Sequence, residues 1–134
     1  MVKSCVWVNG CFDILHRGHI ELFKYANSLG DYLIVGVDDD DRVRASKGED
    51  RPFNCLEDRV EMLRSIRYIN EVVCFNTDKE LDRKVMLSGA DVMVVGSDYE
   101  DKKVIGCDHV KEVKFYRKID GYSTTKILEH STSR

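Results

Sequence analysis

The chain has 134 residues, of which 43% are hydrophobic and 34% are charged. This length suits one globular domain, and we predict a single domain over residues 1–134, because two halves would each be too small to bury a core. The net charge of −3, with no basic stripe, excludes duplex nucleic acid as an expected partner.

Apolar runs and cysteines indicate the cellular setting. The longest apolar runs, such as 32–37 and 92–95, are far shorter than the roughly 20 residues that cross a bilayer, and residues 1–10 lack the apolar stretch of a signal peptide. The five cysteines are odd in number and scattered, which favours neither disulfides nor a zinc site. We expect a soluble cytoplasmic protein with no membrane segment, whose cysteines are small buried hydrophobic residues.

The predicted elements alternate between strands and helices along the chain. In order, they are a strand at 6–8, a helix at 18–29, a strand at 32–37, a helix at 56–66, a strand at 71–75, a short helix at 81–87, strands at 92–95 and 113–116, and a helix from about 123 to 130. The polar segment 38–54 is predicted to be a long loop near the ligand. The fold class is α/β: a single-domain, doubly wound (Rossmann-like) parallel five-stranded sheet with helices on both faces.

The residues after the first strand carry the clearest chemical signal. They read G-C-F-D-I-L-H-R-G-H from Gly10 to His19, and the first helix opens within them. A glycine turn before a helix N-terminus lets backbone N–H groups approach phosphate oxygens, and the helix dipole favours the anion. His16 and His19, with Gly18 between them, place both imidazoles on one side, where they can stabilise charge on a pentacoordinate phosphorus. The alternative interpretation is a pair of solvated surface histidines.

The stretch from Gly10 to His19 resembles the G-x-F-D-x-x-H-x-G-H signature of the cytidylyltransferase-like nucleotidyltransferases. Their second motif, an S-T-T segment at the start of the last helix, has its counterpart in Ser123, Thr124 and Thr125. The resemblance covers the chain from Val6 to about Ile127. It implies that an acceptor phosphate attacks the α-phosphorus of a nucleoside triphosphate and that pyrophosphate leaves.

The resemblance also implies roles for individual residues. The catalytic residues would be His16, His19 and Lys47, a lysine in the loop after the second strand. The nucleotide-binding residues would be Gly10, Cys11, Phe12, Asp13, Gly18, Gly96, Asp98, Arg117, Gly121, Tyr122, Ser123, Thr124 and Thr125. The implied cofactor is Mg²⁺, held mainly by the nucleotide phosphates with no metal ligands from the protein. A homodimer is expected by resemblance alone.

Several polar or reactive residues have two interpretations. Cys11 could be a nucleophile, although we interpret it as a packing residue, and Asp13 could cap the turn instead of meeting the nucleotide. We interpret the run 38–41 as a solvated loop and not a metal cluster, because consecutive side chains point in different directions. We also interpret Arg59 and Arg67, on the second helix, as solvated.

Two subgroups of the family compete for the substrate. Lys47-Gly48, Arg51-Pro52 and Asn54, with the segment 96–99, resemble the adenylyltransferases that activate heptose 1-phosphate, although Val95 and Ser97 depart from the usual pattern. This favours ATP and D-glycero-D-manno-heptose 1-phosphate, giving ADP-heptose. Residues 66–72 and 123–127 resemble instead the CTP:glycerol-3-phosphate cytidylyltransferases, which make CDP-glycerol. From other classes, a non-catalytic nucleotide-binding domain stays open, whereas a flavodoxin-like electron carrier has no use for the paired histidines.

Overall fold

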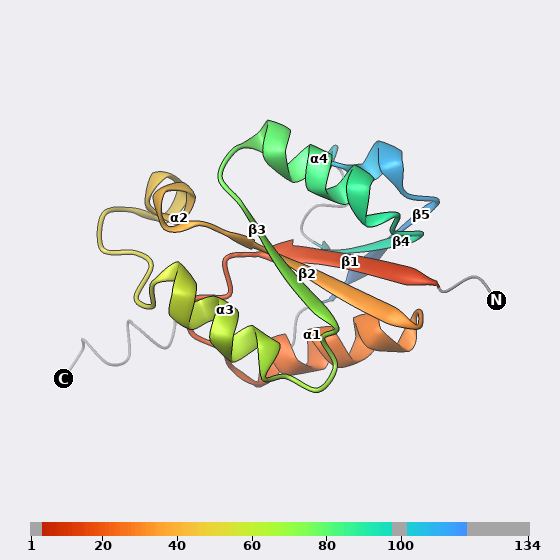
Figure 1. Cartoon of the computed structure of the whole chain (residues 1–134), viewed down its shortest axis with the longest axis horizontal. Coiled ribbons are helices and arrows are strands. Elements are labelled where there is room, and N and C mark those ends of the chain that lie inside the picture. The colour runs from red at the N-terminus through yellow and green to blue at the C-terminus, as the bar shows by residue number, and fades with distance from the viewer. Residues whose placement is uncertain (1–3, 98–101, 118–134) are drawn as a thin grey trace.

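The computed structural model of the chain describes residues 4–97 and 102–117. These residues form a five-stranded sheet in the order β3-β2-β1-β4-β5, with every pairing parallel (Figure 1). The elements are β1 (Cys5–Gly10), α1 (Arg17–Ser28), β2 (Tyr32–Asp38), α2 (Asp40–Lys47), α3 (Leu56–Arg64), β3 (Glu71–Phe75), α4 (Asp78–Ser88), β4 (Val92–Gly96), the 3₁₀ helix η2 (Cys107–His109) and β5 (Glu112–Tyr116). The predicted doubly wound parallel sheet is confirmed. The helix predicted from about 123 lies outside the described residues.

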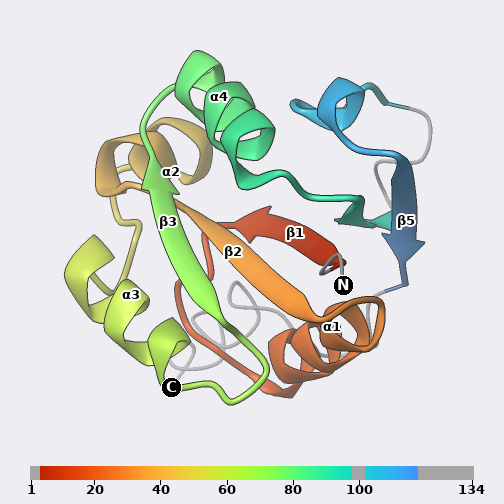
Figure 2. The same ribbon diagram turned by 45° about the vertical axis from the view of Figure 1, so that its right-hand side comes forward.

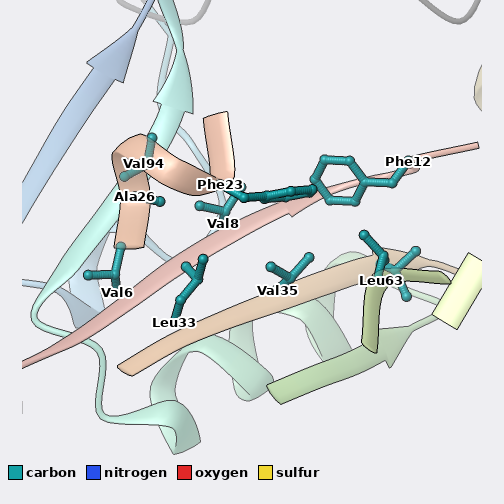
Figure 3. Packing of buried hydrophobic residues seen from close by; sticks show 10 residues of the cluster. Val6, Val8, Phe12, Phe23, Ala26, Leu33, Val35, Leu63 and Val94 are labelled. Carbon is teal, nitrogen blue, oxygen red and sulfur yellow. The ribbon is translucent and has the colours of Figure 1, made fainter. Parts of the chain in front are cut away.

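Helices cover both faces of the sheet because the side chains of its central strands alternate between two cores. Val6 and Val8 of β1 pack in one core with Phe23 of α1 and Leu63 of α3, as Figure 3 shows. Trp7, between those valines, belongs to the second core, which includes side chains of α4. Figures 1 and 2 accordingly show α1 and α3 on one side of the sheet and α4 on the other. Each such buried side chain contributes roughly 1.5–3 kcal/mol.

The segment 38–54 is not the continuous loop that we expected, because Asp40–Lys47 form α2. The side chain of Asp39 caps this helix by accepting a hydrogen bond from the N–H of Arg42 at 2.9 Å. Acidic residues fill its first turn and basic residues its last, which matches the helix dipole. Val43 is its buried residue, so the apolar periodicity that reveals longer helices is missing here.

The sheet changes direction between β1 and β4. From β1 the chain adds β2 and β3 on one side, and then crosses to β4 and β5 on the other. The pairing of β1 with β2 continues to Gly10, whereas its pairing with β4 covers Val6 and Trp7 alone. The carboxyl ends of β1 and β4 therefore separate, which is where open α/β sheets bind ligands. Among the helices of the described residues, none combines the length and the apolar character of a membrane span.

Candidate active site

The turn after β1 delivers two histidines to the start of α1. His16 is the N-cap residue with an extended backbone, and its Nδ1 accepts a hydrogen bond from the N–H of Gly18 at 3.1 Å. Nδ1 of His19 accepts in return from the N–H of His16 at 3.2 Å. This reciprocal arrangement is a capping box, with imidazoles in place of the usual hydroxyl and carboxylate.

The two imidazoles lie against each other. Their ring centroids are 3.8 Å apart and the ring planes are 24° from parallel, so the prediction that both rings lie on one side of the helix is confirmed. Because each Nδ1 accepts from a backbone N–H, a neutral ring carries its proton on Nε2. The pair is thus oriented to present Nε2–H donors, the type of group that stabilises charge on phosphate oxygens.

Phe12 gives the turn its shape. Its φ is 45°, a left-handed backbone that is an outlier for a bulky residue and that recurs at functional sites. Its buried ring packs edge-on against Phe23, with centroids 5.1 Å apart, and against His19 at 5.5 Å. A Cβ added at Gly10 would lie 3.0 Å from the Phe12 ring. Glycine at this position therefore also has a packing reason, besides the approach of phosphate.

Asp13 ties the turn to the segment before α3. Its side chain is fully buried, and its carboxylate accepts from the N–H of Phe53 at 2.7 Å, from the N–H of Asn54 at 2.8 Å and from Nε of Arg51 at 3.3 Å. The amide side chain of Asn54 donates to the main-chain carbonyl of Asp13 at 2.8 Å. The Asp13 side chain accepts these bonds from residues 38 to 41 positions further along the chain, and not from within its own turn, where one interpretation placed its cap. Its direct contact with a nucleotide stays a prediction.

Arg59 is not the solvated side chain that the sequence predicts. We interpreted it as solvated, yet its side chain is 1% exposed. The sequence carried a signal for this: Arg59 stands three residues after Leu56 and four before Leu63, on the apolar stripe of α3. Its guanidinium donates to the carbonyls of three residues and forms an ion pair with a carboxylate of α2; these partners are Asn54, Cys11, Asp38 and Asp40. Arg67, by contrast, lies after α3 and is exposed as predicted.

The acidic run 38–41 is also not the solvated loop that we expected. Asp38, at the carboxyl end of β2, accepts from Nε of Arg42 at 2.7 Å, and Arg42 also reaches Asp78 of α4 at 2.7 Å. Asp39 caps α2, and Asp40 pairs with the buried arginine described above. Helix capping and neighbouring cations therefore give Asp38, Asp39 and Asp40 fixed partners, whereas Asp41 is exposed.

The remaining predicted site residues divide by location. Gly96 ends β4, and Arg117 follows β5, so both lie with Gly10 at the carboxyl edge of the parallel sheet. Lys47 is the last residue of α2 and is exposed. Asp98, Gly121, Tyr122, Ser123, Thr124 and Thr125 lie outside the described residues.

The cysteines do not form the uniformly buried set that we expected. Cys5 is buried, Cys11 and Cys107 are intermediate, and Cys55 and Cys74 are exposed, all with free thiols. Cys55 immediately precedes α3, and Cys74 lies on the edge strand β3, where it alternates with the inward-facing Phe75.

The resemblance implies a magnesium ion near the glycine turn. The described residues contain no cluster of three or more His, Cys, Asp and Glu side chains that could hold a metal. The carboxylate nearest the motif, Asp13, already accepts three hydrogen bonds from the chain. That the nucleotide phosphates hold Mg²⁺ stays a prediction.

Known proteins resemble this chain over almost its whole length. The family described as cytidylyltransferase-like matches residues 7–133. A bifunctional protein HldE of Campylobacter fetus subsp. fetus is 44% identical over 126 residues, which are 94% of this chain and 27% of that protein. A bifunctional protein HldE of Helicobacter hepaticus is 44% identical over 127 residues, 95% of this chain and 26% of that protein. The chain thus spans about a quarter of the length of these curated relatives.

A solved structure has the same fold. The crystal structure of the lipopolysaccharide core biosynthesis protein from Thermoplasma volcanium matches with a TM-score of 0.73, over 89% of this chain and 100% of that chain, at 24% identity. At this level of identity, the likeness concerns the fold alone.

Proposed function

The chain belongs to the cytidylyltransferase-like family of nucleotidyltransferases, and from this premise we propose that it transfers AMP from Mg·ATP to a sugar 1-phosphate and releases pyrophosphate. The observation that carries the proposal is the stacked pair of His16 and His19 at the mouth of α1, oriented by reciprocal hydrogen bonds at Nδ1. Such an oriented pair of donors suits the negative charge that builds up on a reacting phosphate.

In the proposed reaction, a phosphate oxygen of the acceptor attacks the α-phosphorus of ATP in line with the bond that breaks. The new phosphoanhydride bond forms as the bond to the bridging α,β-oxygen breaks, and the electron pair leaves with pyrophosphate. Nε2–H of His16 and of His19 donate to the α-phosphate oxygens, and Lys47 offsets the repulsion between the two anionic substrates. Mg²⁺ enters as part of the Mg·ATP substrate and supplies charge neutralisation at the leaving pyrophosphate.

The acceptor is proposed to be D-glycero-D-manno-heptose 1-phosphate, which would give ADP-heptose. Two features support this choice. The relatives that cover almost the whole chain carry the name HldE, and the segment from Lys47 to Asn54 resembles the heptose 1-phosphate adenylyltransferases. The stretch 66–72 supports the alternative, a CTP:glycerol-3-phosphate cytidylyltransferase.

A matrix of nucleotides and acceptors tests the proposal. The protein is mixed with magnesium, each of the four nucleoside triphosphates and either heptose 1-phosphate, another sugar phosphate or glycerol 3-phosphate, and pyrophosphate is measured. Release with ATP and heptose 1-phosphate above all other pairs is expected. Release with CTP and glycerol 3-phosphate would establish the alternative, and no release with any pair would favour a non-catalytic binding domain.

A further inference from the structure

A closed cycle of hydrogen bonds joins the phosphate turn to α3. The Asp13 carboxylate accepts from the N–H of Asn54 at 2.8 Å, and the carbonyl of Asn54 accepts from Nε of Arg59 at 3.0 Å. Nη1 of Arg59 then donates to the carbonyl of Cys11 at 2.8 Å. Phe12 is the one residue between Cys11 and Asp13, so its backbone closes the cycle.

Phe12 is also the strained residue of the turn. A left-handed φ of 45° in a bulky residue persists only where the surroundings over-determine it. The cycle holds the carbonyl on one side of Phe12 and the carboxylate on the other, while the ring is packed against Phe23. Without the cycle, the backbone would relax toward an ordinary conformation and displace the residues that follow, up to His16.

Arg59 is the link of the cycle that lysine, the other long cationic residue, cannot replace. Its side chain is 1% exposed. Within the planar guanidinium, Nε donates to the carbonyl of Asn54, and Nη1 donates to the carbonyls of Cys11 and Asp38, at the ends of β1 and β2. Nη2 donates to the Asp40 carboxylate at 2.7 Å. Lysine carries the same charge but has one nitrogen and no fixed fork. It can therefore compensate the charge of Asp40 without holding the Asn54 and Cys11 carbonyls together.

We infer that Arg59 is a positioning residue: by closing this cycle, it holds the strained Phe12 turn in the geometry that brings His16 and His19 to the phosphate. The geometric half of this inference stands on the contacts above, and its catalytic half rests on the proposed function.

The test compares Arg59→Lys with Arg64→Lys, which changes an exposed arginine of the same helix. Both variants are made in the full chain and assayed well below their melting temperatures. Hydrogen–deuterium exchange should become faster in peptides that cover 10–16 and 51–54 in Arg59→Lys and stay unchanged in Arg64→Lys. The kcat of pyrophosphate release should fall on the order of 10- to 100-fold in Arg59→Lys, with a smaller change in KM for ATP, since misplacement of catalytic groups acts on kcat.

Asp40→Asn distinguishes the effect of the cycle from the effect of the ion pair between Arg59 and α2. It removes the Asp40 carboxylate but leaves the hydrogen bonds from Arg59 to Asn54 and Cys11. Its kcat and its exchange at 10–16 should match those of the wild-type protein. Equal losses in Asp40→Asn and Arg59→Lys would overturn the inference, as would wild-type exchange and kcat in Arg59→Lys.

A second link keeps the inference testable if Arg59→Lys does not fold. Asp13→Asn weakens the hydrogen bond that the other side chain of the cycle, Asp13, accepts from Asn54. Hydrogen–deuterium exchange at 10–16 should then also become faster. Exchange at the wild-type rate in this variant would overturn the inference. The exchange comparison needs no substrate. A wild-type protein that releases no pyrophosphate would therefore contradict the proposed function and leave the geometric test intact.

Discussion

His16 has two tasks that substitution can separate. Its Nδ1 caps α1 by accepting a hydrogen bond from the N–H of Gly18. In the proposed mechanism, its Nε2–H donates a hydrogen bond to an oxygen of the α-phosphate. Asparagine supplies a capping oxygen but no second ring nitrogen. His16→Ala should therefore lower the free energy of unfolding by about 1 kcal/mol, and His16→Asn by much less. Both should slow pyrophosphate release on the order of 10²- to 10³-fold, as measured by urea titration and a steady-state assay.

The two variants separate the tasks of His16. Asparagine can still cap α1 and alanine cannot, whereas both variants lack the Nε2–H donor. An active His16→Asn protein would mean that the ring serves the helix and not the phosphate. Equal stability of the two variants would mean that the Gly18 hydrogen bond contributes nothing measurable to α1.

Asp38 offers a prediction on pH. Burial raises the pKa of its carboxyl above the ordinary value of 3.8, and the hydrogen bond and charge of Arg42 oppose that rise. Because the folded state holds this proton more tightly, the stability from Asp38 is fully present below 3.8 and is lost as the pH rises through the raised pKa. Asp38→Asn cannot titrate, so the wild-type protein should gain stability relative to it as the pH falls from about 7 to about 4. Urea midpoints across this range measure the difference, and a constant difference would refute the raised pKa.

Some single residues were readable from the sequence and others were not. His16 and His19 stood out because their spacing after a strand and a glycine turn has few other uses. The roles of Asp13 and Arg59 could not be predicted in the same way, because their partners include main-chain groups up to 48 positions away along the chain. The apolar stripe of α3 could indicate that Arg59 is buried, but the groups that compensate its charge are brought close by the fold.

At the scale of elements, α2 has a helix cap whose removal should affect substrate binding. Asp39 caps α2 through the N–H of Arg42, and Lys47 is the last residue of that helix. Asp39→Ala should lower the free energy of unfolding by about 1 kcal/mol. It should also raise the KM for ATP and for the acceptor, since a frayed α2 positions Lys47 less well.

Thr77→Ala is the matched control for this prediction. Thr77 caps α4 by accepting from the N–H of Glu80 at 3.0 Å, and α4 covers the face of the sheet opposite α1. This variant should lose a similar amount of stability, about 1 kcal/mol, and keep both KM values. Raised KM values in Thr77→Ala would show that general loosening of the fold, and not the position of α2, controls binding.

Elements with a dense apolar pattern were predicted well, and those with a sparse one were not. The strand at 71–75 was predicted with the observed bounds, and the two central strands were recognised because their side chains are buried on both faces. For α2, capping and end charges were the available signals, since Val43 is its buried residue. The helix predicted at 81–87 proved to begin at Asp78, after the cap at Thr77.

At the scale of the whole molecule, the sheet order places the ends of β1 and β4 at a switch point, so a nucleotide bound there contacts elements from both halves of the sheet. A ligand that binds the folded state alone stabilises it by about 2.7 kcal/mol at 100 times its Kd. For a domain of this size, Mg·ATP at that concentration should raise Tm by roughly 8–13 °C, and the proposed adenylyltransferase should respond less to Mg·CTP. The measurement is a thermal melt with each nucleotide.

The same melts on His16→Asn distinguish the proposed site from any other. This variant keeps the cap of α1 but lacks the Nε2–H donor, so its melting temperature without ligand should stay near that of the wild-type protein and its response to Mg·ATP should shrink. An undiminished response would place the nucleotide away from the switch point. A larger response to Mg·CTP than to Mg·ATP in the wild-type protein would favour the cytidylyltransferase, because the base that the fold binds more tightly contributes the larger stabilisation at equal concentration.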